Sequence, residues 1–181
     1  MHSKKKSLEC MIISPQIYSD NRGIFFEKYN QKYFKKLGIT HKFVQDNVSQ
    51  SKKNVLRGLH FQKKFPQGKL IKVLKGKIFD VAVDLRKKKS TFGNFYTFTL
   101  SDKDHKSLWV PPGFAHGFCV LSKSAIVEYK CTNFYRFNDQ FTLKWDDEDL
   151  NINWPIRRSI VSKKDKIGLS LKYIINKKLY L

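Results

Sequence analysis

Residues 55–85, VLRGLHFQKKFPQGKLIKVLKGKIFDVAVDL, contain three apolar runs separated by glycine, proline and lysine. We predict strands at Val55–Gln62, Lys69–Lys75 and Lys77–Leu85, because each run is short and the residues between the runs favour turns. Three extended segments so close together in the chain indicate a β-sandwich or a β-barrel.

The flanking sequence continues this pattern of short runs and adds one helix. We predict the helix at Gln31–Leu37, ended by Gly38, because glycine readily takes the left-handed conformation that ends a helix. Residues Ser19–Gly23 form a predicted turn. Further strands are predicted at Cys10–Ile17, Ile24–Tyr29, Lys42–Gln45, Tyr96–Leu100, Leu108–Val110, Phe114–Val120, Ala125–Thr132 and Thr142–Trp145. A single early helix among so many strands does not fit an alternating α/β fold.

Length and composition predict one globular domain over residues 1–181, because 41% of the residues are hydrophobic. The apolar runs are shorter than the ~20 residues that span a bilayer, and the basic N-terminus lacks the features of a secretory signal. Three cysteines without a CxxC pair favour a reducing, cytoplasmic compartment over a disulfide framework or a zinc knuckle. The segment from Lys163 onward could form a short amphipathic helix or a loose tail.

The net charge of +21 raises the question of a nucleic-acid partner. Only six of the 36 basic residues are arginine, although arginine is the better fork for phosphates and bases. The lysines are scattered in short runs along the whole chain, which is typical of a solvated surface. An anionic small-molecule substrate would also benefit from this field, so we expect no nucleic-acid partner and no membrane association.

Strand alternation selects side chains that face the interior. Asp80 and Asp84 lie on one face of their predicted strand, and a buried carboxylate is costly unless it is paired. One of the two is therefore a candidate site residue. Tyr129 shares a face with Val127 and Cys131, which predicts that its ring points inward.

His60 and Arg57 are three residues apart, so strict alternation points them in opposite directions. Gly58 between them could allow a bulge that brings both side chains inward. For His60 three interpretations compete: a hydrogen-bonded core histidine, a metal ligand and a catalytic base.

The metal interpretation rests on residues 111–116, PPGFAH, which have the PxGxxH form of the second cupin motif. The first cupin motif needs HxH followed by a glutamate, whereas this chain offers only HFQ at residues 60–62 and then Lys69. An ammonium near a ligand position repels a cation, so we expect no metal.

Ten blocks of the chain match one known family in order. They are Asp20–Glu27, Gln45–Ser49, Val55–Gln62, Gln67–Leu70, Phe79–Arg86, Thr91–Gly93, Leu108–Pro111, Gly113–Phe118, Tyr129–Thr132 and Trp145–Asp147. In these blocks the chain resembles the dTDP-4-dehydrorhamnose 3,5-epimerase family, in register from about Ile12 to Asp165. The resemblance implies an all-β cupin jelly roll, also called a double-stranded β-helix, with one short N-terminal helix and a short C-terminal extension. It also implies a homodimer that needs neither a metal nor another cofactor.

The activity implied by the resemblance is epimerisation of a dTDP-linked 4-keto-6-deoxyhexose at C3 and C5, which flank the ketone. His60 would be the general base, Asp165 its dyad partner and Tyr129 the acid. The chemistry suits these residue types, because a histidine has a pKa near working pH and a phenol can donate a proton while it is neutral at rest. Lys69 would stabilise the enolate oxygen, with Asp80 as a neighbouring carboxylate.

The remaining residues carried over from the family are substrate contacts. Arg22 and Arg57 would bind the diphosphate through paired donors, and Tyr135 would stack on the thymine. The full predicted set is Arg22, Phe25, Glu27, Gln45, Asn47, Arg57, Gln62, His116, Tyr135, Gln140 and Lys164. Gln140 stands where the family usually has glutamate. Two alternatives stay open: a mono-epimerase that inverts one carbon of a related sugar nucleotide, and a non-catalytic cupin or nucleic-acid-binding protein.

Overall fold

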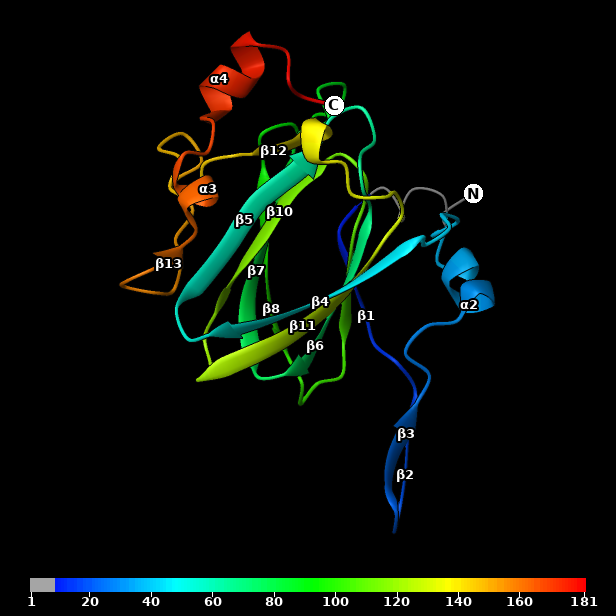
Figure 1. Cartoon of the computed structure of the whole chain (residues 1–181). Coiled ribbons are helices and arrows are strands. Elements are labelled where there is room, and N and C mark those ends of the chain that lie inside the picture. Colours follow the sequence, from blue (N-terminus) through cyan, green and yellow to red (C-terminus); the bar gives the residue numbers. More distant parts are fainter. Residues whose placement is uncertain (1–8) are drawn as a thin grey trace.

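The computed structural model describes residues 9–181 and contains two facing β-sheets (Figure 1). The first sheet has the order β1 (Met11–Ile13), β9 (Ser107–Val110), β6 (Lys69–Lys75), β11 (Ser124–Cys131) and β4 (Gln45–Lys52). The second has the order β12 (Gln140–Thr142), β5 (Val55–Gln62), β10 (Phe114–Val120), β7 (Lys77–Asp84) and β8 (Phe95–Ser101), and β13 (Ile160–Val161) pairs with β5. The predicted all-β jelly roll is confirmed. The prediction of a single domain over residues 1–181 stays a prediction, and the lysine run at residues 4–6 lies outside the described residues.

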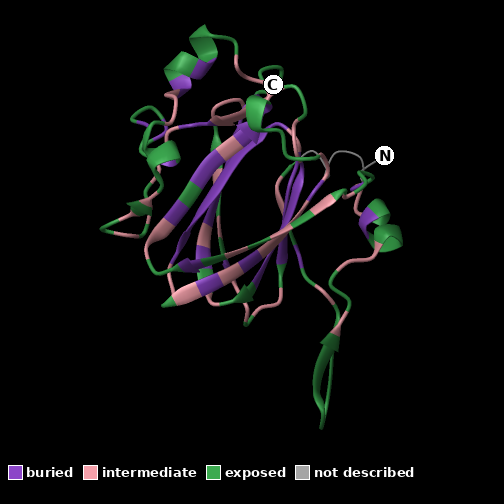
Figure 2. Ribbon diagram, viewed as in Figure 1, coloured by how far each residue is buried: buried purple, intermediate pink, exposed green. Residues whose placement is uncertain are grey.

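The central strands of the second sheet, β10 and β7, are buried on both faces, and Figure 2 shows them mostly in purple. Ile78 and Ala82 of β7 face the first sheet and join a core cluster with Ile71 and Val73 of β6. The opposite face of β7 packs against the C-terminal part of the chain through a second cluster, which includes Val81, Val83, Leu85, Leu143, Leu150, Leu171 and Ile174. Asp80 therefore lies on the inner face of β7, between the sheets.

A bulge in β5 turns two polar side chains to the same side of the strand. His60 pairs with His116 and Arg57 with Phe118, so two residues of β5, Gly58 and Leu59, oppose the single residue Gly117 of β10. Gly58 has φ +123°, and a Cβ there would lie 2.5 Å from the Cα of Gly117. Only glycine fits this close approach. The predicted bulge is confirmed, and Arg57 and His60 line one cavity.

The early helix, α2 (Gln31–Lys36), has a defined cap at each end. The Asn30 side chain accepts the N–H groups of Lys32 and Tyr33, which have no partner within the helix. At the other end Gly38 has φ +89°, and Ile39 N–H donates to the Phe34 carbonyl over 2.9 Å. The prediction that Gly38 ends this helix is confirmed.

Three strand predictions have wrong bounds. No strand forms at residues 42–44; β4 begins at Gln45 and continues to Lys52. Its inward side chains are polar, so the apolar alternation that reveals a half-buried strand is missing. The strand predicted at Cys10–Ile17 is broken at residues 14–16, because Pro15 has no N–H for a ladder. The strand predicted at Thr142–Trp145 lies earlier, as β12.

A hairpin of β2 (Ile17–Asp20) and β3 (Gly23–Phe26) extends away from the two sheets (Figure 1). Its predicted turn is confirmed, with φ +126° at Gly23. Tyr18, Ile24 and Phe25 are exposed along it, and Figure 2 shows nearly all of the hairpin in green.

The C-terminal extension is ordered against the second sheet. It contains α3 (Lys163–Lys166) and α4 (Leu171–Asn176). A separate 3₁₀ helix, η1 (Phe137–Asp139), lies earlier in the chain, between β11 and β12. Leu181 exchanges backbone hydrogen bonds with Leu85 and Lys87, each over 2.8 Å. The segment is therefore two short docked helices. Among residues 9–181 no helix is long and apolar enough to cross a membrane.

Candidate active site

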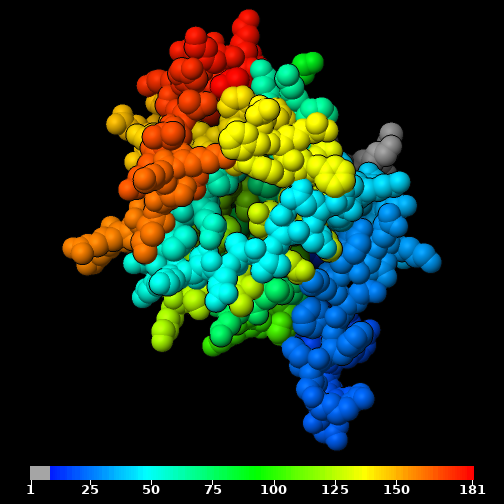
Figure 3. All heavy atoms as spheres, viewed as in Figure 1, coloured from blue at the N-terminus to red at the C-terminus, as the bar shows by residue number. Residues whose placement is uncertain are grey.

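Two cavities share the space between the sheets. A cavity of about 210 Å³, the wide cavity, and one of about 120 Å³, the narrow cavity, have His60, Lys69 and Tyr129 in both linings. The wide cavity is also lined by Gln45, Asn47, Phe61, Gln62, Gln67, Cys131, Tyr135 and Gln140, and the narrow cavity by Ser49, Arg57, His116, Gly117 and Phe118. Figure 3 shows the molecule hollowed between the cyan strands β4 and β5 and the yellow segment that contains η1.

His60 and Asp165 form a hydrogen-bonded pair although 105 positions separate them in the chain. His60 Nε2 lies 2.6 Å from Asp165 Oδ1, and Gly58 N–H donates to Asp165 Oδ2 over 3.2 Å. Asp165 is buried in α3, where the Ser162 hydroxyl caps the helix by accepting the Asp165 N–H. Because a carboxylate only accepts, Nε2 carries the proton and Nδ1 keeps a lone pair.

Burial and neighbouring charges set the protonation states of the pair. Burial lowers the pKa of His60 below its ordinary value; Asp165 opposes this shift, whereas Lys69 and Lys164 add to it. Burial favours the neutral acid of Asp165, but its hydrogen bonds with His60 and Gly58 keep the pKa of Asp165 below its ordinary value. At neutral pH the pair is therefore a neutral imidazole beside a carboxylate, which is the state a base requires.

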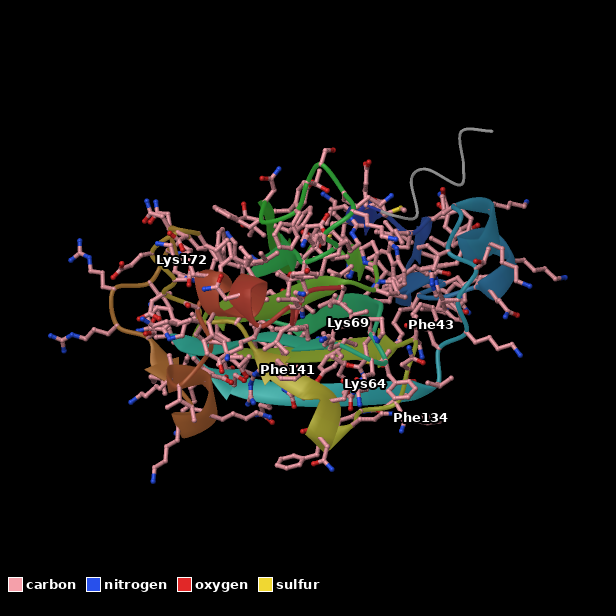
Figure 4. The ribbon with its side chains drawn as sticks, turned by 90° about the horizontal axis from the view of Figure 1, so that it is seen from above. Phe43, Lys64, Lys69, Phe134, Phe141 and Lys172 are labelled. Atoms are coloured by element: carbon pink, nitrogen blue, oxygen red, sulfur yellow. The ribbon has the colours of Figure 1, made fainter. Side chains whose placement is uncertain are left out.

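Lys69 extends from the start of β6 into both cavities and is 9% exposed. Within the described part of the chain its ammonium makes no hydrogen bond or ion pair. Burial lowers the pKa of Lys69, although Cys131 and Asp80 oppose the shift. Seen from above, Lys69 lies toward the middle of the barrel and Phe134 toward its edge (Figure 4). A buried ammonium without a partner can stabilise a negative charge that develops beside it.

Tyr129 lies on β11 with its ring inward, as the alternation predicts, and packs against the core between the sheets. Burial raises the pKa of the Tyr129 phenol, Cys131 raises it further, and Arg57 lowers it. The phenol is therefore neutral and can donate a proton.

A second histidine–carboxylate pair lies deeper. His116 Nε2 is 2.9 Å from Asp80 Oδ2, and both side chains are buried between β10 and β7. Asp84 instead binds Arg86, at 2.6 Å to Nη2, and accepts from the Thr91 hydroxyl. Of the two carboxylates predicted as site candidates, Asp80 lies beside the cavities, and Asp84 ties a loop to the end of β7.

Polar residues of β4 connect the cavity wall to the rim. Gln45 Nε2 donates to Asn47 Oδ1 over 2.9 Å, and Gln45 Oε1 accepts the Tyr135 N–H over 2.7 Å. Arg57 Nε donates to the Ser51 hydroxyl over 2.9 Å. These bonds place Gln45, Asn47, Arg57 and Tyr135 around the two cavities, as the sequence predicts.

Three further predicted contacts, Gln62, Gln140 and Lys164, have side-chain polar groups that already make hydrogen bonds within the protein. Gln62 donates to the carbonyls of Phe65 and Phe134 and accepts the Arg136 N–H, so its amide shapes the loops. Lys164 Nζ donates to Gln140 Oε1 over 2.8 Å. This bond crosses the rim between α3 and β12.

Three predicted contacts do not reach the cavities. Arg22 pairs with Asp20 at 2.6 Å and its side chain is 86% exposed, while Phe25 is 70% exposed. Glu27 accepts from the Asn30 amide. All three lie on or next to the protruding hairpin, away from His60.

Three residues with polar or thiol side chains line the cavities but are absent from the predicted set, namely Ser49, Gln67 and Cys131. Ser49 belongs to an alternating pattern that is visible in the sequence, because Gln45, Asn47, Ser49 and Ser51 share one face of β4. The wrong start of this strand concealed it. Within residues 9–181 no three His, Cys, Asp or Glu side chains gather as a metal site would require.

Comparisons with known proteins agree on one family. The family model for dTDP-4-dehydrorhamnose 3,5-epimerase matches residues 5–173. The dTDP-4-dehydrorhamnose 3,5-epimerase of Methanothermobacter thermautotrophicus is 48% identical over 166 residues, which cover 90% of each chain. A crystal structure from Legionella pneumophila, in complex with dTDP-4-keto-L-rhamnose, has a TM-score of 0.89 at 45% identity and covers 94% of this chain and 92% of that one. A 3'-monoepimerase from Streptomyces bikiniensis, in complex with dTDP-quinovose, has a TM-score of 0.88 at 26% identity, with coverages of 94% and 88%.

Proposed function

Because this chain belongs to the dTDP-4-dehydrorhamnose 3,5-epimerase family, we propose that it converts dTDP-4-dehydro-6-deoxy-D-glucose to dTDP-4-dehydro-L-rhamnose. The family predicted from the sequence is confirmed. The observation that carries the proposal is the His60–Asp165 pair, which shares its cavities with Lys69 and Tyr129. These are the base, the oxyanion partner and the acid that inversion beside a ketone requires.

His60 Nδ1 takes the proton from the carbon next to the ketone. Such a proton is weakly acidic, and a neutral imidazole is a base of suitable strength. Asp165 fixes the tautomer through Nε2 and stabilises the imidazolium that forms, because its buried carboxylate lies 2.6 Å away. The pair therefore assists the step that breaks the C–H bond.

Lys69 stabilises the enolate. The electron pair of the broken C–H bond moves onto the C4 oxygen, and the buried ammonium of Lys69, which has no partner among residues 9–181, stabilises this charge. Asp80 lies near Lys69 and raises its pKa, which supports the charged form. The His116–Asp80 pair fixes the imidazole of His116 at the same cavity, toward the sugar or the phosphates.

Tyr129 returns a proton to the opposite face of the carbon, which inverts its configuration. After one inversion His60 is an imidazolium and Tyr129 a phenolate; exchange with water removes the proton from His60 and restores it to Tyr129. The same cycle at the second carbon completes the product. Hydrogen from solvent is therefore incorporated at each inverted carbon.

The remaining predicted contacts bind the nucleotide part. Arg57 is oriented by Ser51 and offers paired donors to a diphosphate. Tyr135 is exposed at the rim beside Gln45, where a thymine could stack on its ring. Gln45, Asn47, Gln62, Gln140 and Lys164 surround this path from the rim to His60.

A homodimer explains where Arg22, Phe25 and Glu27 make their contacts. In one chain they lie away from the cavities, on a hairpin with exposed apolar side chains. Exposed apolar surface of this kind favours burial against another protein. The hairpin of one subunit would thus contribute these three residues to the substrate site of its partner.

We expect the reaction to need neither a metal nor another cofactor. The donors around the cavity argue for this, because His60 and His116 are each already paired with a carboxylate and Lys69 is a cation beside them. The buried thiols of Cys119 and Cys131, both free, fit a reducing cytoplasm.

The test is turnover of dTDP-4-dehydro-6-deoxy-D-glucose in D₂O, followed by NMR of the product. We expect deuterium at both C3 and C5, no loss of activity after exhaustive chelation, and no exchange with His60→Ala. Deuterium at one carbon only would identify a mono-epimerase. Absence of exchange at both carbons, with strongly salt-dependent binding to DNA, would favour the non-catalytic alternative.

A further inference from the structure

The inner face of β4 carries a stripe of four polar side chains, of which one has no partner. Gln45, Asn47 and Ser51 each hydrogen-bond to other side chains of the protein. The Ser49 hydroxyl, in the middle of the stripe, is shielded from solvent and has no hydrogen-bond partner in the described structure. Buried polar atoms are nearly always paired, so this exception needs an explanation.

The narrow cavity beside Ser49 explains why its hydroxyl has no partner in the described structure. Ser49 lines the narrow cavity together with Arg57, His60, Lys69 and Tyr129. Thr142 has the other unpartnered buried hydroxyl in residues 9–181, and it lines neither the wide nor the narrow cavity. Ser49 therefore differs from Thr142, because the space beside it can be filled by a ligand that supplies the missing hydrogen bond.

The strand register shows which part of a ligand Ser49 would meet. On one side of Ser49 along β4 lies Ser51, whose hydroxyl accepts from Arg57. On the other side lies Asn47, which is opposite Tyr129 in the ladder. Ser49 is thus between the group assigned to the diphosphate and the acid assigned to the reacting carbons.

The hexose of the proposed substrate has the same order of groups. C1 is bonded to the diphosphate, C3 and C5 react, and C4 is the ketone. C2 lies between the diphosphate end and the first reacting carbon, and its hydroxyl takes no part in the reaction. We propose that Ser49 binds the substrate through a hydrogen bond to the C2 hydroxyl; this assignment rests on the proposed function.

The experiment compares two substrates with each of three proteins. The substrates are dTDP-4-dehydro-6-deoxy-D-glucose and its analogue without the C2 hydroxyl, and the proteins are wild type, Ser49→Ala and the control Thr142→Val. We expect wild type to prefer the hydroxylated substrate by about tenfold in kcat/KM, equivalent to about 1.4 kcal/mol. Ser49→Ala should lose this preference and leave turnover of the analogue within about twofold of wild type. Thr142→Val should keep the preference.

A thermal unfolding measurement separates ligand binding from a structural role. Because the Ser49 hydroxyl has no hydrogen-bond partner among residues 9–181, we expect Ser49→Ala not to lower Tm. An equal loss of kcat/KM on both substrates, an undiminished preference, or a lowered Tm would overturn the assignment. Failure of wild type to turn over either substrate would refute the proposed function, and the Ser49 assignment with it.

Discussion

Replacement of Asp165 by asparagine tests how the base is held. Asp165 accepts from both His60 and Gly58 and its side chain is 4% exposed, so water cannot replace the carboxylate. If the amide oxygen of the substituted side chain still accepts from Gly58, its NH₂ group faces His60, which forces Nε2 to accept and moves the imidazole proton to Nδ1. The lone pair then no longer faces the substrate.

The expected decrease in kcat follows from the hydrogen bond that His60 loses. A hydrogen bond to a charged group is worth about 1.5–3 kcal/mol, which corresponds to about a 10- to 150-fold decrease in kcat. Asp165 also raises the pKa of His60 against burial and two lysines. Its removal should therefore lower that pKa further and move the ascending limb of the pH profile of kcat/KM to more acidic pH.

The assay is turnover over a range of pH, with Asp84→Asn as the matched control. Asp84 is also buried and also paired, but with Arg86 at the end of β7. We expect the control to lose stability without a shift of the ascending limb. If Asp165→Asn keeps the wild-type limb and loses less than about twofold in kcat, then Asp165 does not orient His60 and the reasoning fails.

Other substitutions test the remaining roles. Lys69→Gln should decrease kcat by about 10²–10³, as expected for loss of an oxyanion donor, and an unchanged kcat would remove Lys69 from that role. Tyr129→Phe should block product formation, while His60 still exchanges the substrate hydrogen with D₂O; loss of both signals would contradict the division into base and acid. Mixing inactive Arg22→Ala and His60→Ala chains should restore about a quarter of wild-type activity if hairpins complete partner sites, and no recovery would contradict that arrangement. The free energy of unfolding should fall as pH decreases below about 6.5, because unfolded His60 takes up a proton at its ordinary pKa and folded His60 does so only at lower pH; His60→Gln should reduce this slope in chemical denaturation.

Apolar alternation predicts the strands that form the barrel but not the strand that forms much of the site. β5, β6 and β7 have apolar side chains on their buried faces, so their periodicity is visible in the sequence. β4 has Gln45, Asn47, Ser49 and Ser51 on its inner face, because a ligand-binding wall needs hydrogen-bonding groups. The apolar alternation that indicates a strand is therefore weakest in β4, which carries many of the residues that line the cavities.

The inward direction of Tyr129 and the bulge at Gly58 follow from local rules, namely alternation and glycine geometry. The pairing of His60 with Asp165 does not, because no local pattern indicates which distant residue will meet a given strand. That residue was identified by the resemblance. The hydrogen bonds of the Gln62 amide to neighbouring loops cannot be predicted from the sequence either. Alternation predicts the direction of a side chain and not the number of hydrogen bonds it makes.

The 105 positions between His60 and Asp165 also affect how the protein is made. A ribosome that has synthesised both sheets has not yet supplied the carboxylate, and α3 can dock only after residue 165 has left the exit tunnel. Contacts between such distant residues close large loops and form late in folding. The strands of both sheets should therefore be able to pair in the nascent chain before it acquires a competent base, so that catalytic activity reports the completion of folding.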